Sequence, residues 1–440
     1  MTIRRAPSLA TSVVRTTFAL LCLSALACEA PAQDVKRVPP EPAALKAPEL
    51  QDIGRPHSLL VRDGKLYVGG TKGVAALDEK ALVVWSQELP EADGRALDVE
   101  GDHVAYSSFL VAGVDRGSGL TAALMWGAPS QKLVVERAEV GMLSRADGKA
   151  IWSTRLSEPA GLSPPALGKT AVAVQASKSL LLYDRASGKQ ITAVDTFTNW
   201  LGLAEAWNTR LPVTRPQWVD DGVITGHQSW MKKVSAQGDE LMGAKSLGKN
   251  FTRLTSGPIP CRDRLILSEA AYPEGNIISG KKAKVYASSQ KAESLWVSDT
   301  DDDVAGTGDV ACYDDAIFAV GNALISAFSY DGKVLWRYNS KGGILIPGTH
   351  RGILRAGTLP IAHQITAGRQ VVAAGPYLYV TSRSERNWKG KLDVITVFDA
   401  KSGELLEQID TATMIVDMAV FGSDLALTTT EGLKFIALKK

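Results

Sequence analysis

The densest group of residues that could do chemistry is the acidic segment DTDDDVAGTGD, which starts at Asp299. The carboxylates of Asp299, Asp301 and Asp303 alternate in the way that a calcium-binding loop arranges its first ligands. The later positions do not fit such a loop. Val304 replaces the glycine of its sharp turn, and Val310 replaces its bidentate glutamate. The segment therefore predicts a solvated loop between two structural units, and no metal site.

The remaining residue types that carry chemistry are scattered along the chain. The five histidines do not form an HExxH or a similar metal-binding spacing, and they are His57, His103, His227, His350 and His363. There is also no GxSxG nucleophile elbow, no phosphate-binding loop and no CxxCH haem signature. We therefore predict no catalytic residue, no metal and no cofactor.

The first residues have the features of a secretory signal peptide. Arg4, Arg5 and Arg15 supply a basic region, and the apolar run FALLCLSALA follows at residues 18–27. Ten apolar residues are too few to cross a membrane as a helix. Residues 1–27 are thus expected to direct export and to be absent from the mature fold.

The cleavage site can be read in two ways. Cleavage before Cys28 follows the small residues ALA and resembles the lipobox of bacterial lipoproteins, although Ala25 stands where that motif usually has leucine. Cleavage before Gln33 would instead leave Cys28 as an exposed thiol in an oxidising compartment. We favour lipid attachment at Cys28, with plain secretion as the alternative. Residues 28–50 are rich in proline and alanine and are expected to form an extended tether.

Two further cysteines, Cys261 and Cys312, lie just before or on apolar segments of neighbouring repeat units. In an exported protein they are expected to form a disulfide. The alternative is two buried free thiols in separate sheets.

The charge of the mature chain argues against nucleic acid as a partner. Subtracting the three leader arginines from 49 basic residues leaves 46 against 47 acidic residues, a net charge near −1. The chain has no basic tract, so phosphate binding has no electrostatic support.

A repeated unit dominates the sequence after residue 50. In its clearest copy, three apolar segments read KLYVGG (65–70), GVAALD (73–78) and ALVVW (81–85), with turn residues between them. A preceding short strand completes four strands per unit. Copies are found at residues 57–89, 95–156, 161–195, 215–247, 255–299, 304–340, 365–410 and 411–440. The second copy carries an insertion at residues 113–138, and the last shows only three strands.

Each unit has the same turn before its fourth strand, as in SYDGK and FDAKSGE. A tryptophan recurs on that fourth strand and is expected to pack one sheet against the next, at Trp85, Trp152, Trp296 and Trp336. Units that cannot bury both faces must stack, so we predict an all-β, eight-bladed propeller over residues 51–440, with seven blades as the alternative. An N-terminal strand near residues 44–54 is expected to complete the last blade and close the ring.

The unit, visible in KLYVGGTKGVAALDEKALVVW (65–85), resembles the pyrroloquinoline-quinone (PQQ)-like propeller repeat. That repeat occurs in quinoprotein dehydrogenases and in the BamB group of outer-membrane assembly lipoproteins. The resemblance implies the propeller fold and says little about activity. Quinoprotein dehydrogenases typically carry adjacent cysteines, and this chain has no Cys-Cys pair.

Two segments depart from the repeat and contain residue types that dominate protein interfaces. The candidate partner-binding residues are Trp126 in the insertion and Trp200, Trp207, Arg210 and Arg215 in the segment 195–218. The alternative is that these loops pack over the central channel.

The sequence therefore predicts a monomeric, non-catalytic scaffold for other envelope proteins. We expect an outer-membrane lipoprotein that faces the periplasm or the cell surface, or otherwise a soluble periplasmic or secreted protein. Envelope assembly is one role that the resemblance implies. The alternatives are a PQQ-dependent oxidoreductase and a propeller that binds a glycan or small ligand.

Overall fold

The computed structural model describes residues 36–38, 50–116, 131–176, 179–195, 215–227, 230–246, 253–270, 284–291, 293–299, 307–321, 324–339, 369–383, 393–411 and 413–439. The chain divides into two compact units, Met1–Lys36 and Arg37–Lys440. Only Lys36 of the first unit is described, and the second unit holds the fold. No helix in the described ranges has the length and apolar character of a transmembrane span.

The second unit is built from antiparallel sheets whose strands follow one another in sequence order. We call these sheets blades 1 to 8. Blade 1 contains β2 (Pro56–Arg62), β3 (Lys65–Gly70), β4 (Gly73–Leu77) and β5 (Val83–Glu88), and blade 2 contains β6 (Gly94–Glu100), β7 (His103–Arg116), β8 (Gln131–Ser144) and β9 (Ala150–Arg155). Blade 3 contains β10 (Ala166–Leu167), β11 (Ala171–Ala176), β12 (Ser179–Asp184) and β13 (Gln190–Asp195). Blade 4 contains β14 (Gln217–Val219), β15 (Gly222–His227), β16 (Trp230–Ser235) and β17 (Glu240–Ser246).

The second half of the chain repeats this arrangement. Blade 5 contains β18 (Arg253–Cys261), β19 (Arg264–Ala270), β20 (Lys284–Ser289) and β21 (Ser294–Asp299), and blade 6 contains β22 (Thr307–Tyr313), β23 (Ala316–Gly321), β24 (Leu324–Ser329) and β25 (Val334–Asn339). Blade 7 contains β26 (Val371–Ala374), β27 (Tyr377–Arg383), β28 (Asp393–Asp399) and β29 (Leu405–Asp410). Blade 8 contains β30 (Ile415–Phe421), β31 (Asp424–Thr429) and β32 (Gly432–Ala437).

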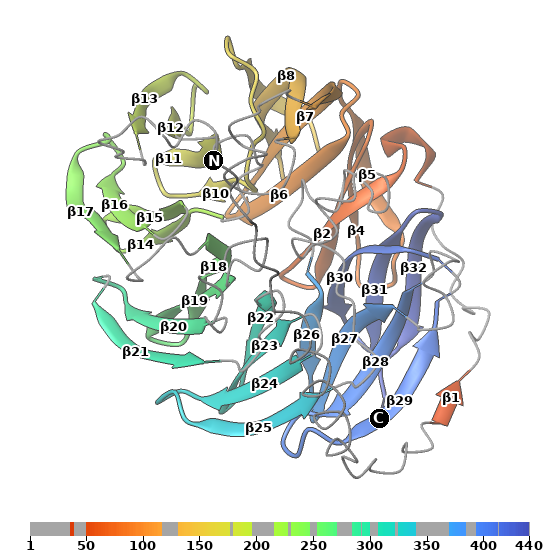
Figure 1. Ribbon diagram of the computed structural model, residues 1–440. Helices are drawn as coiled ribbons and strands as arrows, with labels where there is room; N and C mark the ends of the chain where they lie inside the picture. The colour runs from red at the N-terminus through yellow and green to blue at the C-terminus, as the bar shows by residue number, and fades with distance from the viewer. Residues whose placement is uncertain are drawn as a thin grey trace, which may run out of the picture. The chain divides into compact units, whose positions relative to one another are not determined.

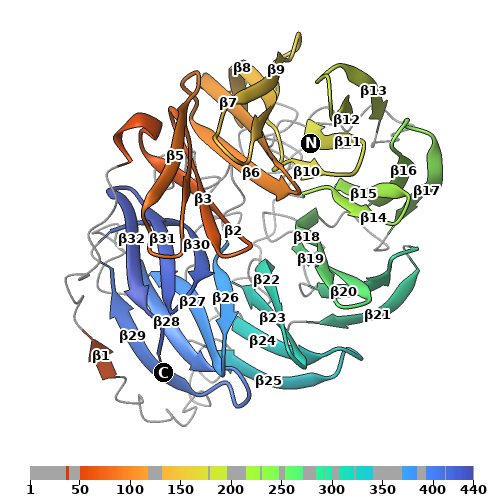
Figure 2. The same ribbon diagram turned by 180° about the vertical axis from the view of Figure 1, so that it is seen from behind.

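The blades form a closed ring, which confirms the predicted eight-bladed propeller. The first strand of each blade contacts the first strands of both neighbours, so these strands line the centre (Figure 1). An apolar cluster fills each of the eight seams between consecutive blades. The last of them joins Leu59 and Val68 of blade 1 to Phe421 and Phe435 of blade 8. Figure 2 shows these two blades side by side from behind.

Burial along the strands explains why the sequence folds in this way. The third strand β4 is buried at all five positions, because both of its faces are covered by neighbouring blades. In the fourth strand β5, by contrast, Trp85 is buried and most of the other residues are exposed. Inner strands therefore have apolar residues at nearly every position, and outer strands have them at alternate positions. This pattern specifies a sheet that runs outward from the centre of the ring.

The recurring tryptophans connect consecutive blades, as predicted. Each indole N–H donates a hydrogen bond to a turn carbonyl of the next blade; the pairs are Trp85 with Arg145 (3.0 Å), Trp152 with Arg185 (2.8 Å), Trp296 with Tyr330 (2.8 Å) and Trp336 with Ala400 (3.0 Å). The same turns contain Gly148, Gly188, Gly332 and Gly403, where a Cβ atom would overlap the indole. All four glycines have positive φ, so the turn conformation and the close approach both require glycine.

The last blade differs from the prediction. Its sheet has three strands, β30, β31 and β32, and no described segment adds a fourth. Within the predicted closing segment, Gln51–Ile53 form a short 3-10 helix and residues 44–49 lie outside the described residues. The sheet order instead puts the short strand β1 (Lys36–Val38) beside β29 at the edge of blade 7. Ring closure rests on seam contacts between blades 8 and 1, because apolar packing needs no shared sheet.

The insertion of the second repeat is also shorter than predicted. Strands β7 and β8 remain paired from His103 with Ser144 to Arg116 with Gln131. Residues 113–116 and 131–138 are therefore strand and not loop, because alternating Val and polar residues continue the pairing. Residues 117–130 lie outside the described residues.

Candidate functional site

The two faces of the propeller differ in the connections that they carry. In an antiparallel sheet the second and fourth strands run in the same direction, so their ends lie on one face. The connections that leave these ends include residues 117–130, 196–214, 271–283, 340–368 and 384–392, which lie outside the described residues. We call this the long-connection face. The opposite turn face carries short turns, many with a residue at positive φ.

Four of the five predicted partner-binding residues fall in these undescribed connections. Trp126 follows β7, while Trp200, Trp207 and Arg210 follow β13, and all four lie outside the described residues.

Arg215 is the one candidate partner-binding residue that the structure describes. It lies just before β14 at the inner end of blade 4. Its guanidinium forms an ion pair of 2.5 Å with Asp98 in blade 2, and its Nε donates to the carbonyl of Pro165 at 3.1 Å. The side chain is 29% exposed. Arg215 thus bridges blades 2, 3 and 4, and its role in partner binding stays a prediction.

Three aspartates on first strands link their blade to the next one. Each carboxylate accepts the backbone N–H of the following residue and a backbone N–H of the next blade. The cross-blade bonds are Leu167 N–H to Asp98 (2.8 Å), Gln370 N–H to Asp309 (2.8 Å) and Leu59 N–H to Asp417 (2.8 Å). We call Asp98, Asp309 and Asp417 the inner aspartates.

Asp309 ends the acidic segment that was expected to be a solvated loop, and for this residue the expectation is wrong. Its carboxylate also accepts the N–H groups of Val310 and Val371, at 2.8 and 3.3 Å. Burial raises the pKa of the carboxyl to about 6, although these N–H groups and Arg369 oppose the shift. Residues 300–306 lie outside the described residues.

Arg369 and Asp417 form the corresponding junction at the closing seam. The Arg369 backbone N–H donates to Asp417 at 2.7 Å, and its guanidinium donates to the carbonyl of Leu59 at 2.5 Å. Burial raises the pKa of the Asp417 carboxyl, and Arg369 opposes this shift. The junction therefore joins blades 7, 8 and 1 through charge-assisted bonds.

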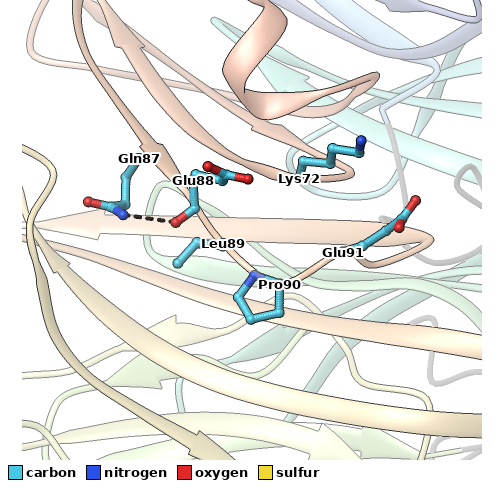
Figure 3. A pocket seen from close by; sticks show the side chains of 6 residues that line it. All are labelled: Lys72, Gln87, Glu88, Leu89, Pro90 and Glu91. Carbon is cyan, nitrogen blue, oxygen red and sulfur yellow. Dashed lines mark hydrogen bonds between the residues drawn. The ribbon is translucent and has the colours of Figure 1, made fainter.

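An open hollow lies on the long-connection face of blade 1, beyond the end of β5 (Figure 3). Its lining consists of Lys72, Gln87, Glu88, Leu89, Pro90 and Glu91. The only hydrogen bond drawn among them runs from the Gln87 amide to the Glu88 carbonyl, at 2.8 Å. One ammonium and two carboxylates can hold polar groups of a partner by ion pairing, but these side chains include no nucleophile or oriented acid–base pair.

A buried arginine beneath this hollow fixes its backbone. Arg95 donates to the carbonyls of Gly70, Gly73 and Pro90, at 2.5, 3.2 and 2.7 Å. It also lies over the ring of Tyr106, with 5.7 Å between the guanidinium carbon and the ring centroid. These bonds give Arg95 a structural role.

The Tyr106 hydroxyl completes this buried group by donating to Glu139 at 2.5 Å. Burial and the Glu139 carboxylate raise the pKa of Tyr106. His57 is also fully buried, and neither ring nitrogen has a hydrogen-bond partner in the described part of the chain. Burial, with Arg55 and Arg95 nearby, lowers its pKa to about 3, so the imidazole is neutral at physiological pH.

Cys261 and Cys312 meet at the seam between blades 5 and 6. Cys261 ends β18 and Cys312 lies in β22, and they are bonded as a disulfide with 5.9 Å between their Cα atoms. This covalent link joins first strands, as the inner aspartates do at other seams.

Among the described residues, no three His, Cys, Asp or Glu side chains gather as a metal site would require. Sequence patterns did not predict the polar groups that the fold brings together, which are the inner aspartates, Arg95 and Arg369. A usable signal exists: Asp98, Asp309 and Asp417 each interrupt an apolar first strand and precede Val or Met.

No family profile matches this chain, and no curated protein matches it in sequence. Solved structures do share its fold. BamB from Moraxella catarrhalis is 14% identical with a TM-score of 0.56, and the match covers 86% of this chain and 95% of that one. The C-terminal WD40 domain of Sif2 is 11% identical with a TM-score of 0.55, covering 88% and 98%.

A computationally designed protein, Ika8, shares the fold at 12% identity and a TM-score of 0.53, with 92% and 100% coverage. At such identities the likeness shows the fold alone. The class defined by the fold is thus the eight-bladed β-propeller, and propellers host many unrelated functions.

Proposed function

We propose that this protein is a non-catalytic scaffold that binds other proteins through its long-connection face. The observation that carries the proposal is the unequal distribution of connections, because all five long segments leave the same ends of the strands. Two of these segments contain the tryptophans and arginines typical of interfaces. Among the described charged groups, Arg215 with Asp98 and Arg369 with Asp417 are engaged in holding blades together.

The proposal includes export and a lipid on Cys28, with residues 28–50 as the tether. The leader sequence and the lipobox-like cleavage site support this location. One acyl-bearing cysteine would hold the propeller at the outer membrane without a spanning helix. The likeness in fold to BamB supports a place among envelope proteins, with outer-membrane assembly as a possible role.

Capture from detergent-solubilised membranes tests the scaffold. The tagged full-length protein is expected to retain specific envelope proteins, and deletion of residues 198–212 should abolish their capture. The matched control changes the turn face, as Asp221→Ala, and should capture as the unaltered protein does. Equal capture by the deletion variant would refute the assignment of this face.

The anchor and the main alternative are tested separately. Cys28→Ser should move the protein from the membrane to the soluble fraction without changing capture in detergent. PQQ and Ca²⁺ added to the purified protein should produce neither dye reduction nor a shift in melting temperature. Dye reduction would favour the oxidoreductase.

A further inference from the structure

The fourth strand is the outermost strand of the first six blades, and no described residue pairs with its outer edge. The tryptophan position is held by Thr192 in blade 3 and by Met242 in blade 4. The residue just before this position is aliphatic and exposed in all six blades; the residues are Val84, Ile151, Ile191, Leu241, Leu295 and Leu335, between 40% and 51% exposed. An unpaired edge with apolar side chains invites pairing with another strand.

Strand β21 differs from the other five in having large exposed aliphatic side chains at two alternate positions. Leu295 and Val297 are 47% and 46% exposed, so two large aliphatic side chains stand on one face of the strand. Ser294–Ser298 contain no charged residue and no proline, the usual protections of an edge. In β25, by comparison, Arg337 occupies the position that Val297 has in β21.

The packing of β21 explains why this face is open. Trp296 and Ser298 bond the next blade through the carbonyls of Tyr330 and Gly332, at 2.8 and 2.6 Å. Because side chains alternate along a strand, Leu295 and Val297 point the opposite way, toward blade 4. There the tryptophan position is taken by Met242.

We propose that the outer edge of β21 binds an extended segment of another protein by strand addition. The segment would be uncharged, with aliphatic residues at alternate positions that pack on Leu295 and Val297, while its backbone pairs with the free edge. Blade 7 supplies a precedent, since β1 lies beside β29 and belongs to no blade. In β29 the equivalent residue, Leu406, is partly buried and less exposed than Leu295.

Amide hydrogen exchange of the full chain with a synthetic peptide, Lys-Val-Thr-Val-Thr-Val-Lys, tests the proposal. At a peptide concentration ten times the dissociation constant, exchange of β21 amides is expected to slow about tenfold. The double variant Leu295→Lys with Val297→Lys should lose this protection. Both side chains are exposed, so the variant is expected to fold, and an unchanged melting temperature verifies this.

The matched control is Ile151→Lys, which adds a charge to the edge of β9 and should leave the protection of β21 unchanged. Unchanged exchange of β21 with peptide present would overturn the proposal, as would equal protection of β5 and β9. Protection that rises with protein concentration alone would also overturn it, because the occupant would then be a second copy of this chain.

Discussion

The outer and inner rims of the seams hold the blades together by opposite chemistry. At the outer rim a neutral indole of one blade donates to a carbonyl of the next, as Trp296 does to Tyr330. At the inner rim a carboxylate of one blade accepts from a backbone N–H of the next, as Asp309 does from Gln370. The outer contacts combine apolar burial with one bond, whereas the inner contacts are charge-assisted.

This difference indicates which contacts should change their contribution to stability with pH. The outer contacts contain no titrating group, so their contribution should not change with pH. Two of the inner contacts depend on carboxyls whose pKa values burial raises, those of Asp309 and Asp417. Seam 5/6 is distinct, because a disulfide takes the inner position.

The largest expected effect comes from breaking an outer contact. Trp296→Ala removes a partly buried indole and its bond to Tyr330, so the free energy of unfolding should fall by about 4 kcal/mol. Denaturant unfolding measures the change. Met242→Ala, at the equivalent position of blade 4, should cost less because no indole is lost there. Equal losses would show that the tryptophan has no special part in the seam.

Breaking the inner covalent link should have a nearly similar effect. Closing a loop of 51 residues between Cys261 and Cys312 stabilises the chain by roughly 4 kcal/mol in the chain-entropy model, with measured values often lower. Reductant should therefore lower the melting temperature, and the double variant Cys261→Ala with Cys312→Ala should be insensitive to it. Alkylation without reductant should label neither cysteine, and two labelled thiols would contradict the disulfide.

Asp309 should make stability depend on pH. Burial raises the pKa of Asp309 to about 6, above the value near 4 of an unfolded aspartate. The native state therefore favours the protonated form, and this contribution is present below pH 4 and lost as pH rises through 6. Asp309→Asn should remove a decline of up to about 3 kcal/mol between pH 4 and 7.

A change at the outer rim provides the control for this measurement of stability against pH. Trp296→Phe removes an indole N–H but no titrating group, so its unfolding free energy should follow pH as the unaltered protein does. A flat difference between the Asp309→Asn variant and the unaltered protein from pH 4 to 7 would refute the pH dependence.

The smallest expected effect comes from removing a second hydrogen bond at the outer rim. Ser298→Ala removes one partly buried hydroxyl that donates to Gly332 at 2.6 Å, and should cost about 1 kcal/mol in denaturant unfolding. Ser294→Ala, on an exposed residue of the same strand, should cost less. A larger loss for Ser294→Ala would show that the Ser298 hydroxyl has no special part in the seam.

Much of the fold could be predicted because its outer contacts repeat in the sequence. Trp85, Trp152, Trp296 and Trp336 recur at one place in the unit, and each pairs with a turn glycine in the next blade. A local pattern of this kind reveals both the strand and its neighbour. The inner contacts were missed, because a single aspartate in an apolar strand does not say which N–H groups surround it.

The candidate site shows the same limit. Arg215 was selected as an interface residue type, whereas the fold brings it to Asp98 across two blades, over a separation that no local pattern encodes. The closing segment was misplaced for a similar reason. Among the described residues the last blade has three strands, and packing of blades 8 and 1 against each other closes the ring.

The sequence by itself determined the repeating four-stranded unit and its turns, because side-chain alternation and positive φ at glycine are local properties of the chain. It also determined the tryptophans that join one blade to the next. Only the tertiary structure decided which charged groups become buried and paired, since the inner aspartates and Arg369 acquire partners from blades distant in sequence. Burial and long-range pairing, which set the pKa of Asp309, exist only once the ring has closed.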